Sequence, residues 1–530
     1  MKHFNVTFKP DGRQVSIHAG AALIEAAGQA GIILNTICGG KGTCGKCAVN
    51  LEPQAQQVLA CQYHIQSDIT VAIPPDSRFF EHKILTRGID IQGKVRPDVC
   101  EKYKSTKYAD KIFGLAVDIG TTTVVAKLID MTTGSCLATE AALNPQTQYG
   151  DDVVSRITYA ETNARLTKLH KTIIDCINDL TAKLCSQASV DTECIYEMCV
   201  VGNTTMNHIF LKLPITQLGQ APYRAFSLDA KNLSPQELSL CINPAGNIHT
   251  VENIAGFVGS DTTAVAIAVD MDSVEEMTLV VDIGTNGEIV LGTKDKLYAA
   301  SCAAGPALEG ARISQGSRAM EGAIEAVVVN EGDIGLDVIG GCAPRSICGS
   351  GLIDAVAVLL DLGVIDASGR FVEPSKVKDT LPPAIFSRIV ELRGQPAFCL
   401  AYAKTGKLPK VLLTQADIRQ VQLAKAAIRV GIKFLQKKIS LRDSDIEHIL
   451  LAGAFGSYIR RESALRIGLL PEVPVEHIRF VGNAASSGAQ IILLSRDYRD
   501  LARELAHRIR YIEIANEPDF ASVFADSMLF

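Results

Sequence analysis

Four cysteines near the start of the chain constrain its fold more than any other feature of the sequence. They follow the pattern Cys38-x5-Cys44-x2-Cys47-x13-Cys61, and three glycines lie in the first gap. Four thiolates converging from one tight loop can bind a [2Fe-2S] cluster, and glycine lets backbone N–H groups approach the cluster sulfurs. Structural zinc also takes four cysteines, usually in two short pairs, and buried free thiols are the third interpretation. The spacing favours the iron–sulfur cluster.

The residues around these cysteines predict a small β-rich domain. Alternating apolar residues at 3–8 and 14–18 flank a Pro-Asp-Gly turn and predict a β-hairpin, and 21–30 predicts an Ala-rich helix. Further short strands are expected at 46–51, 58–62 and 69–73. This order resembles the β-grasp fold of plant-type and adrenodoxin-like ferredoxins, and the five-residue first gap is similar to the adrenodoxin-like variant. The last gap is shorter than in a free ferredoxin, which indicates a shortened loop or strand.

Length and charge limit the class of protein. The 530 residues predict about three domains, since single domains usually run to ~100–200 residues. A net charge of −6 and the lack of a Lys/Arg cluster argue against a nucleic-acid partner. The first eight residues lack the apolar core of a signal peptide, and no apolar stretch reaches the ~18 residues of a membrane span. We therefore expect a cytoplasmic protein with no membrane association, whose other cysteines are free thiols.

Beyond residue 112 the pattern changes to α/β and contains the same hairpin twice. An apolar strand at 113–117 continues into Asp118-Ile-Gly-Thr-Thr-Thr123 and a second strand, and the strand at 279–281 continues into Asp282-Ile-Gly-Thr-Asn-Gly287 in the same way. Such a repeat predicts a duplicated domain. Small residues in these turns leave N–H groups free to bind oxyanions, and the two aspartates can hold Mg²⁺ directly or through water. The two copies together predict a nucleotide site.

The duplicated hairpin resembles that of the superfamily of acetate and sugar kinases, heat-shock chaperone ATPases and actin. The resemblance implies two ribonuclease H-like lobes facing each other across a cleft, each with one hairpin on the phosphates of ATP. The segment Ala452-Gly-Ala-Phe-Gly-Ser457 is similar to the superfamily's adenosine-binding turn. Three other turns can either direct a helix N-terminus at the cleft or simply begin a capped helix: 201–205, 348–351 and 481–484. We interpret 414–417 as a structural capping box.

Five segments together are similar to the ATP-dependent reductive activators of corrinoid proteins: 114–123, 201–206, 281–288, 302–310 and 451–456. The resemblance covers nearly the whole chain and implies a [2Fe-2S] domain joined to a kinase-like ATPase. The implied activity is one-electron reduction of Co(II) to Co(I) in the corrinoid protein of a methyltransferase or corrinoid iron–sulfur system. A low-potential electron donor protein is implied as well, and lobes of this superfamily often pair as homodimers. The linker is too short for the extra small domain of longer relatives, which leaves the corrinoid partner open.

The expected architecture is a β-grasp ferredoxin domain at 1–80, a linker at 81–111, ATPase lobe I at 112–276 and lobe II at 277–530. The linker serves as a tether or lets the cluster domain move between donor and acceptor. Asp118 and Asp282 are expected to orient Mg²⁺ and the attacking water. The expected cluster ligands are Cys38, Cys44, Cys47 and Cys61. The expected ATP-binding residues are Gly120, Thr121, Thr122, Thr123, Asn203, Thr204, Gly284, Thr285, Asn286, Gly349, Ser350, Gly453 and Gly456.

Energetics explain why such domains would be joined. A plant-type [2Fe-2S] centre lies near about −400 mV, so electron transfer to Co(II) is uphill, and each 100 mV of deficit costs ~2.3 kcal/mol. Three alternatives have different signatures. The activator of 2-hydroxyacyl-CoA dehydratases lacks an N-terminal ferredoxin domain, a redox-regulated small-metabolite kinase requires a substrate pocket with a base, and a chaperone-like protein with structural zinc would contain no iron.

Overall fold

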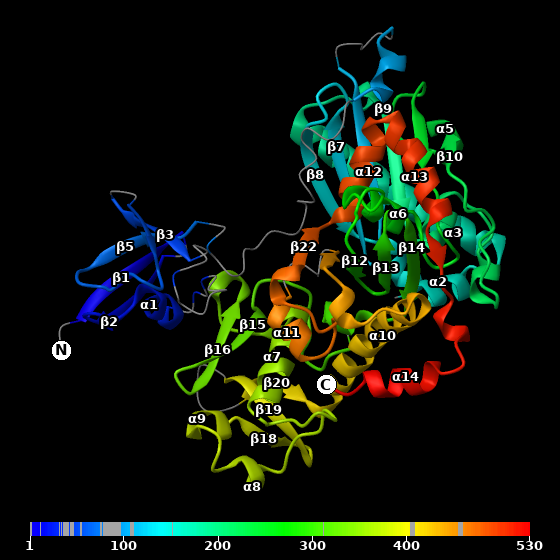
Figure 1. The fold of residues 1–530 in the computed structure, drawn as a ribbon. Coiled ribbons are helices and arrows are strands. Elements are labelled where there is room, and N and C mark those ends of the chain that lie inside the picture. Colours follow the sequence, from blue (N-terminus) through cyan, green and yellow to red (C-terminus); the bar gives the residue numbers. More distant parts are fainter. Residues whose placement is uncertain are drawn as a thin grey trace.

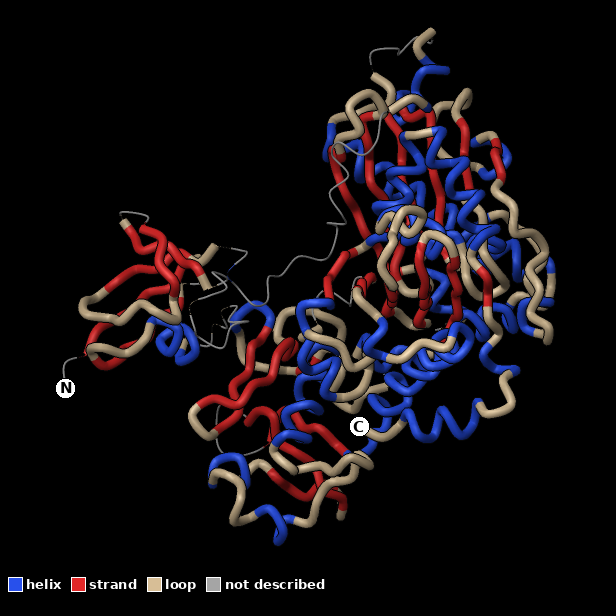
Figure 2. Tube along the Cα trace, in the orientation of Figure 1, coloured by secondary structure: helices blue, strands red, loops and turns tan. Residues whose placement is uncertain are grey.

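The computed structural model describes residues 3–10, 12–30, 32, 34, 42, 47–53, 56–74, 77, 97–105, 111–150, 152–310, 312–402, 409–453 and 459–530. A small β domain lies beside two larger lobes in which helices pack on β-sheets (Figures 1 and 2). Among the helices of these described ranges, none has both the length and the apolar character needed to cross a membrane.

The small domain is the expected β-grasp. Its sheet has the order β2-β1-β5-β3-β4, in which β1 and β5 are parallel and the other pairs antiparallel. Alternate residues such as Val6 and Phe8 point inward and pack with Leu23 of the helix, so the period-2 pattern does produce a one-sided core. The elements are β1 (His3–Lys9), β2 (Arg13–His18), α1 (Leu23–Gln29), β3 (Ala48–Glu52), β4 (Gln56–Leu59) and β5 (Ile69–Ala72).

Two six-stranded sheets form the centres of the lobes, and their strand orders confirm the duplication. Lobe I has the order β10-β11-β9-β6-β7-β8, and lobe II has β22-β21-β12-β13-β14-β23. In both sheets the first hairpin strand is antiparallel to the second and parallel to a later strand. The lobe I strands are β6 (Phe113–Ile119), β7 (Thr123–Asp130), β8 (Cys136–Leu143), β9 (Ile195–Gly202), β10 (Lys231–Leu233) and β11 (Asn247–Thr250). The lobe II strands are β12 (Thr278–Ile283), β13 (Gly287–Thr293), β14 (Lys296–Cys302), β21 (His448–Ala452), β22 (Ile478–Gly482) and β23 (Arg510–Tyr511).

Lobe II also carries two three-stranded sheets, with orders β16-β15-β17 and β18-β19-β20. The first lies beside the β-grasp domain (Figure 1), where a Cβ atom at Gly341 would lie 2.2 Å from Nη2 of Arg13. Their strands are β15 (Ala323–Asn330), β16 (Asp333–Val338), β17 (Ser346–Ile347), β18 (Ile389–Leu392), β19 (Gln395–Tyr402) and β20 (Pro409–Thr414).

Helices α6 and α12 join the two lobes. They pack on each other and share one apolar core with Ala116 of β6 and Val290 of β13, so this core includes residues from both large sheets. Helix α10 begins at the expected capping box, in which the Asp417 amide donates to Thr414 Oγ1 at 3.2 Å. The helices are α2 (Val153–Tyr159), α3 (Asn163–Ala188), α4 (Thr204–Phe210), α5 (Pro235–Leu238), α6 (Ser260–Ala268), α7 (Gly349–Asp361), α8 (Pro374–Val377), α9 (Pro383–Phe386), α10 (Gln415–Ile439), α11 (Arg461–Arg466), α12 (Ala484–Leu494), α13 (Arg496–Arg508) and α14 (Phe520–Ser527).

The last described part of the expected linker is anchored to lobe I. The 3₁₀ helix η2 (Val99–Tyr103) is mostly buried, and the Tyr103 hydroxyl donates to Oε1 of Glu197 at 2.6 Å. Glu197 is fully buried and also pairs with Lys102 and with Arg499 of α13, the latter at 3.0 Å. A buried carboxylate needs such partners because desolvating an unpaired charge is costly. The anchor therefore fixes where the chain that comes from the small domain joins lobe I.

Candidate functional site

The two hairpin turns line one cavity of about 230 Å³ between the lobes. The Gly120 amide donates to Thr123 O at 3.0 Å, and the Gly284 amide donates to Asn286 O at 3.0 Å, so a backbone hydrogen bond closes each turn, although the second turn is one residue shorter. A Cβ atom at Gly120 would lie 2.7 Å from Thr123 O, which makes glycine necessary there. The predicted residues that line the cavity are Asp118, Gly120, Thr121, Thr122, Thr123, Asn203, Asp282, Gly284, Thr285, Asn286 and Gly453.

Five carboxylates line this cavity, namely Asp118, Asp261, Asp282, Glu288 and Glu309. Removal from bulk water, followed by repulsion from Asp261 and Asp282, raises the pKa of Asp118 to about 8. Removal from water and repulsion from Asp261 raise the pKa of Asp282 to about 7. Burial likewise raises the pKa of Asp261 and of Glu288. Carboxylate oxygens that repel each other in a cleft suit a hard divalent cation such as Mg²⁺, which would relieve the repulsion.

Asp261, Glu288 and Glu309 line the cavity but are not among the site residues predicted from the sequence. Asp261 is the second residue of α6, reached by a loop far from either hairpin, and no local pattern marks it as facing the cavity. Glu288 follows the second hairpin turn directly, inside the 281–288 segment, and this adjacency was a usable signal. Asn483, at the start of α12, also lines the cavity and hydrogen-bonds Asp118, which favours the ionised carboxylate.

The strand-to-helix turns differ in what they contribute. Asn203 caps α4 through its side chain and donates to Thr121 Oγ1 at 2.9 Å, so it serves both the helix and the cavity. Thr204 lies outside the lining, where its hydroxyl donates to Ala255 O at 2.5 Å. Gly349 and Ser350 also lie outside it, and the Ser350 hydroxyl donates to Glu325 O at 2.8 Å at the start of α7. The turn at 348–351 thus begins a helix, while Gly456 lies outside the described residues.

Glycine at position 453 is required by the site itself. It follows β21 with φ of +92°, and a Cβ atom there would lie 2.5 Å from Oδ1 of Asp282. The predicted adenosine turn therefore begins directly against an acid of the second hairpin.

Two of the four predicted cluster ligands are described, and they lie together. Cys47 is buried and Cys61 half-buried, with their sulfur atoms 3.3 Å apart. The β3–β4 hairpin explains the short gap, because Ala48 pairs with Leu59 and the Ala60 amide donates to Cys47 O at 2.9 Å. Cys38 and Cys44 lie outside the described residues. The close approach of the Cys47 and Cys61 sulfur atoms fits two ligands of one cluster.

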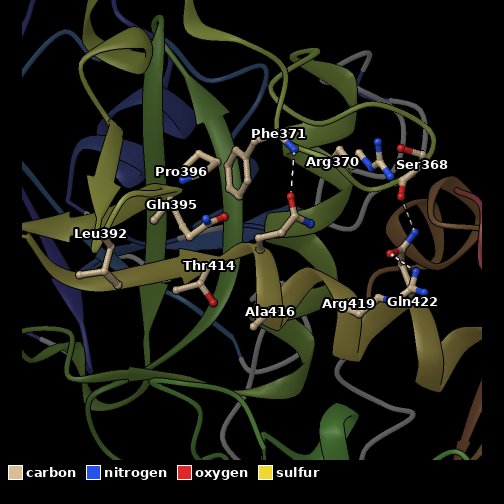
Figure 3. A pocket seen from close by; sticks show the side chains of 12 residues that line it. Ser368, Arg370, Phe371, Leu392, Gln395, Pro396, Thr414, Ala416, Arg419 and Gln422 are labelled. Carbon is tan, nitrogen blue, oxygen red and sulfur yellow. Dashed lines mark hydrogen bonds between the residues drawn. The ribbon is translucent and has the colours of Figure 1, made fainter.

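A larger groove of about 760 Å³ lies on lobe II, at the N-terminal end of α10, and shares no lining residue with the hairpin cavity (Figure 3). Arg370 and Arg419 lie at its edge (Figure 3). The side chains of Gln415 and Gln422 form hydrogen bonds with backbone atoms of the neighbouring loop at 368–371. Among the described residues that line this groove, none is acidic or a histidine. The described lining residues of this groove therefore supply neither a carboxylate nor an imidazole.

Comparison with known proteins agrees with this arrangement. Three family models match consecutive parts of the chain: a 2Fe-2S iron–sulfur cluster binding domain at 6–66, the RACo middle region at 113–274, and the C-terminal ASKHA domain of RACo at 276–530. The ASKHA match agrees with the predicted ATP-binding fold.

Two relatives and one solved structure each match most of the chain. The corrinoid activation enzyme RamQ of Eubacterium limosum is 34% identical over 98% of this chain and 97% of its own. The [Co(II) methylated amine-specific corrinoid protein] reductase of Methanosarcina barkeri is 26% identical over 75% of this chain and 73% of its own. The solved structure of a reductive activator for corrinoid, iron–sulfur protein has a TM-score of 0.73, 32% identity, and coverage of 99% of this chain and 98% of that chain. The chain therefore belongs to the family of ATP-dependent reductive activators of corrinoid proteins.

Proposed function

We propose that this protein reduces the cobalt of a corrinoid protein from Co(II) to Co(I), one electron at a time, at the expense of ATP. The observation that carries the proposal is the presence, in one chain, of converging cluster cysteines and of two facing hairpins around an acidic cavity. Relatives over most of the chain are named for action on corrinoid proteins. A donor protein with a low reduction potential supplies the electron to the cluster. Two copies of the chain form a homodimer.

The cysteines and the hairpins have separate roles. Cys38, Cys44, Cys47 and Cys61 hold a [2Fe-2S] cluster, which when bound accepts and releases single electrons. N–H groups and hydroxyls of the two hairpin turns bind the phosphates of ATP. Asp118 and Asp282 position Mg²⁺ and the attacking water, and Asp261 and Glu288 add negative charge that a cation must neutralise.

Coupling requires that the nucleotide change the docking of the partner. ATP shifts an uphill electron transfer only if its binding or hydrolysis alters the affinity for one redox state of the corrinoid protein over the other. Because α6 and α12 share a core with both large sheets, closure of the lobes over ATP repositions surfaces on both sides of the cleft. The anchor at Glu197 keeps the tether of the cluster domain attached to lobe I during this movement.

The proposed function predicts ATP-dependent formation of Co(I). The anaerobic full-length protein, a strong chemical reductant and candidate Co(II) corrinoid proteins are mixed with Mg-ATP, Mg-ADP or no nucleotide, and Co(I) absorbance is followed. We expect Co(I) to accumulate with one class of corrinoid protein and only with Mg-ATP. Reduction at the same rate with all three additions, or with no partner at all, would contradict the proposal. ATP-dependent phosphorylation of a small metabolite instead would favour the kinase alternative.

A further inference from the structure

A chain of hydrogen bonds crosses the cleft between the two hairpins and ends on an acid of lobe II. Oγ1 of Thr122, in the first hairpin, lies 3.0 Å from Oγ1 of Thr285, in the second. The Thr285 hydroxyl donates to Oε1 of Glu309 at 2.6 Å. A hydroxyl has one proton to donate. Because Thr285 gives its proton to Glu309, the proton between the two threonines comes from Thr122, and neither hydroxyl has a proton left for a phosphate.

Glu309 is held in this position by the backbone around it. It is the last residue of the 3₁₀ helix Pro306–Glu309, and the Gly305 amide before that helix donates to Thr285 O at 2.9 Å. After it, Gly310 has φ of +81°, and a Cβ atom there would lie 2.0 Å from Ser317 O. Glu309 lines the same cavity as Asp118 and Asp282. The helix and the second hairpin thus bring a carboxylate into the gap between the two phosphate-binding turns.

We propose that Glu309 is a positioning residue that competes with a phosphate of the nucleotide for the hydroxyl of Thr285. Its carboxylate accepts the hydrogen bond from Thr285 that a phosphate would otherwise accept, and through Thr285 and Thr122 it links the two hairpins. Binding of a nucleotide exchanges these hydrogen bonds: Thr122 and Thr285 turn to the phosphates, and Glu309 leaves Thr285. The inference rests on the proposed assignment of this cavity to ATP, but not on the reduction of cobalt.

The negative charge of Glu309 makes this exchange of hydrogen bonds depend on a divalent cation. A carboxylate and a polyphosphate repel each other at short range, and the repulsion is strong in a cleft with little water. A divalent cation on the phosphates reduces it. Glu309 therefore weakens the binding of metal-free nucleotide more than it weakens the binding of nucleotide that carries a divalent cation. Glutamine at this position would keep the shape and an oxygen acceptor for Thr285, while removing the charge.

The test measures affinity of the full-length protein for a fluorescent ADP analogue, with Mg²⁺ and with a chelator. For Glu309→Gln we expect about 10-fold tighter binding without Mg²⁺ and a much smaller change with it. Thr285→Val should weaken binding under both conditions, because it removes a phosphate donor. Glu391→Gln, an exposed acid on β18, is the matched control and should bind as the wild type does. Far-UV circular dichroism checks that each variant is folded.

Two results would overturn the inference. Unchanged affinity of Glu309→Gln without Mg²⁺ would show that the carboxylate does not compete with phosphates. Weaker binding of this variant with Mg²⁺ would show that Glu309 helps to hold the bound cation instead. Neither measurement uses a corrinoid protein or the cluster. A failure here therefore leaves the proposed reduction of cobalt untouched, and absence of Co(I) in the reduction assay leaves this inference untouched.

Discussion

Replacement of Cys47 by serine is expected to remove most of the bound iron and, with it, the reduction of cobalt. Cys47 is buried beside Cys61, with the two sulfur atoms 3.3 Å apart, so a serine oxygen there is a poor substitute for a thiolate ligand. We expect iron content and the EPR signal of the reduced cluster to fall at least ~10-fold. ATP hydrolysis should persist, because the hairpin cavity is built from residues of the two lobes alone.

The matched control is Cys176→Ser, which changes a half-buried cysteine of α3 outside the four-cysteine motif. Its iron content and EPR signal should equal those of the wild type. Full iron content in Cys47→Ser would mean that this residue is not a ligand. Zinc in place of iron in the wild-type protein, purified without oxygen, would contradict the assignment of the whole motif.

Replacement of Asp282 by asparagine is expected to lower the rate of ATP hydrolysis by about 10²–10³-fold, the typical cost of removing a group that stabilises charge in the transition state. Asp282 lines the cavity at the end of β12, and its pKa of about 7 reflects removal from water and repulsion by Asp261. Asparagine keeps the size of the side chain but binds a divalent cation less well. The iron content should remain that of the wild type, since the cluster domain is separate.

A measurement of stability distinguishes a role of Asp282 in the site from a role in folding. Because the environment of Asp282 disfavours its charged form, Asp282→Asn should be at least as stable to urea as the wild type in the absence of metal. Asp175→Asn, an exposed position of α3, is the control for both measurements. A variant that hydrolyses ATP normally would contradict the role of Asp282. A variant that is less stable to urea than the wild type would contradict the expected effect on stability.

The features that the sequence predicts correctly are those encoded by patterns within short segments. The alternating strands of the β-grasp and the repeated Asp-x-Gly-Thr turns each lie within short segments, and the fold confirms both the small domain and the duplication. The gap of 13 residues before Cys61 is shorter than that of a free ferredoxin. The β3–β4 hairpin explains it, since a tight antiparallel return brings both ends of the gap together.

Residues that reach the cleft from other elements were not predictable in this way. Asp261 enters from the start of α6, and Glu309 enters from a short 3₁₀ helix, so only the tertiary fold places them beside the hairpins. Conversely, Gly349 and Ser350, in a turn that resembles a phosphate site, begin α7 and lie outside the lining of the hairpin cavity. Patterns of periodicity report which face of an element is buried, not which distant elements meet there.

The coupling of the two halves can be measured in a single turnover. The cluster of the full-length protein is reduced, the chemical reductant is removed, and a Co(II) corrinoid protein is added with Mg-ATP or with Mg-ADP. With Mg-ATP, we expect Co(I) to appear at the rate at which the cluster is reoxidised, with no more than one Co(I) for each cluster oxidised. With Mg-ADP, neither change should occur. Equal formation of Co(I) with both nucleotides, or formation of Co(I) while the cluster stays reduced, would contradict the account.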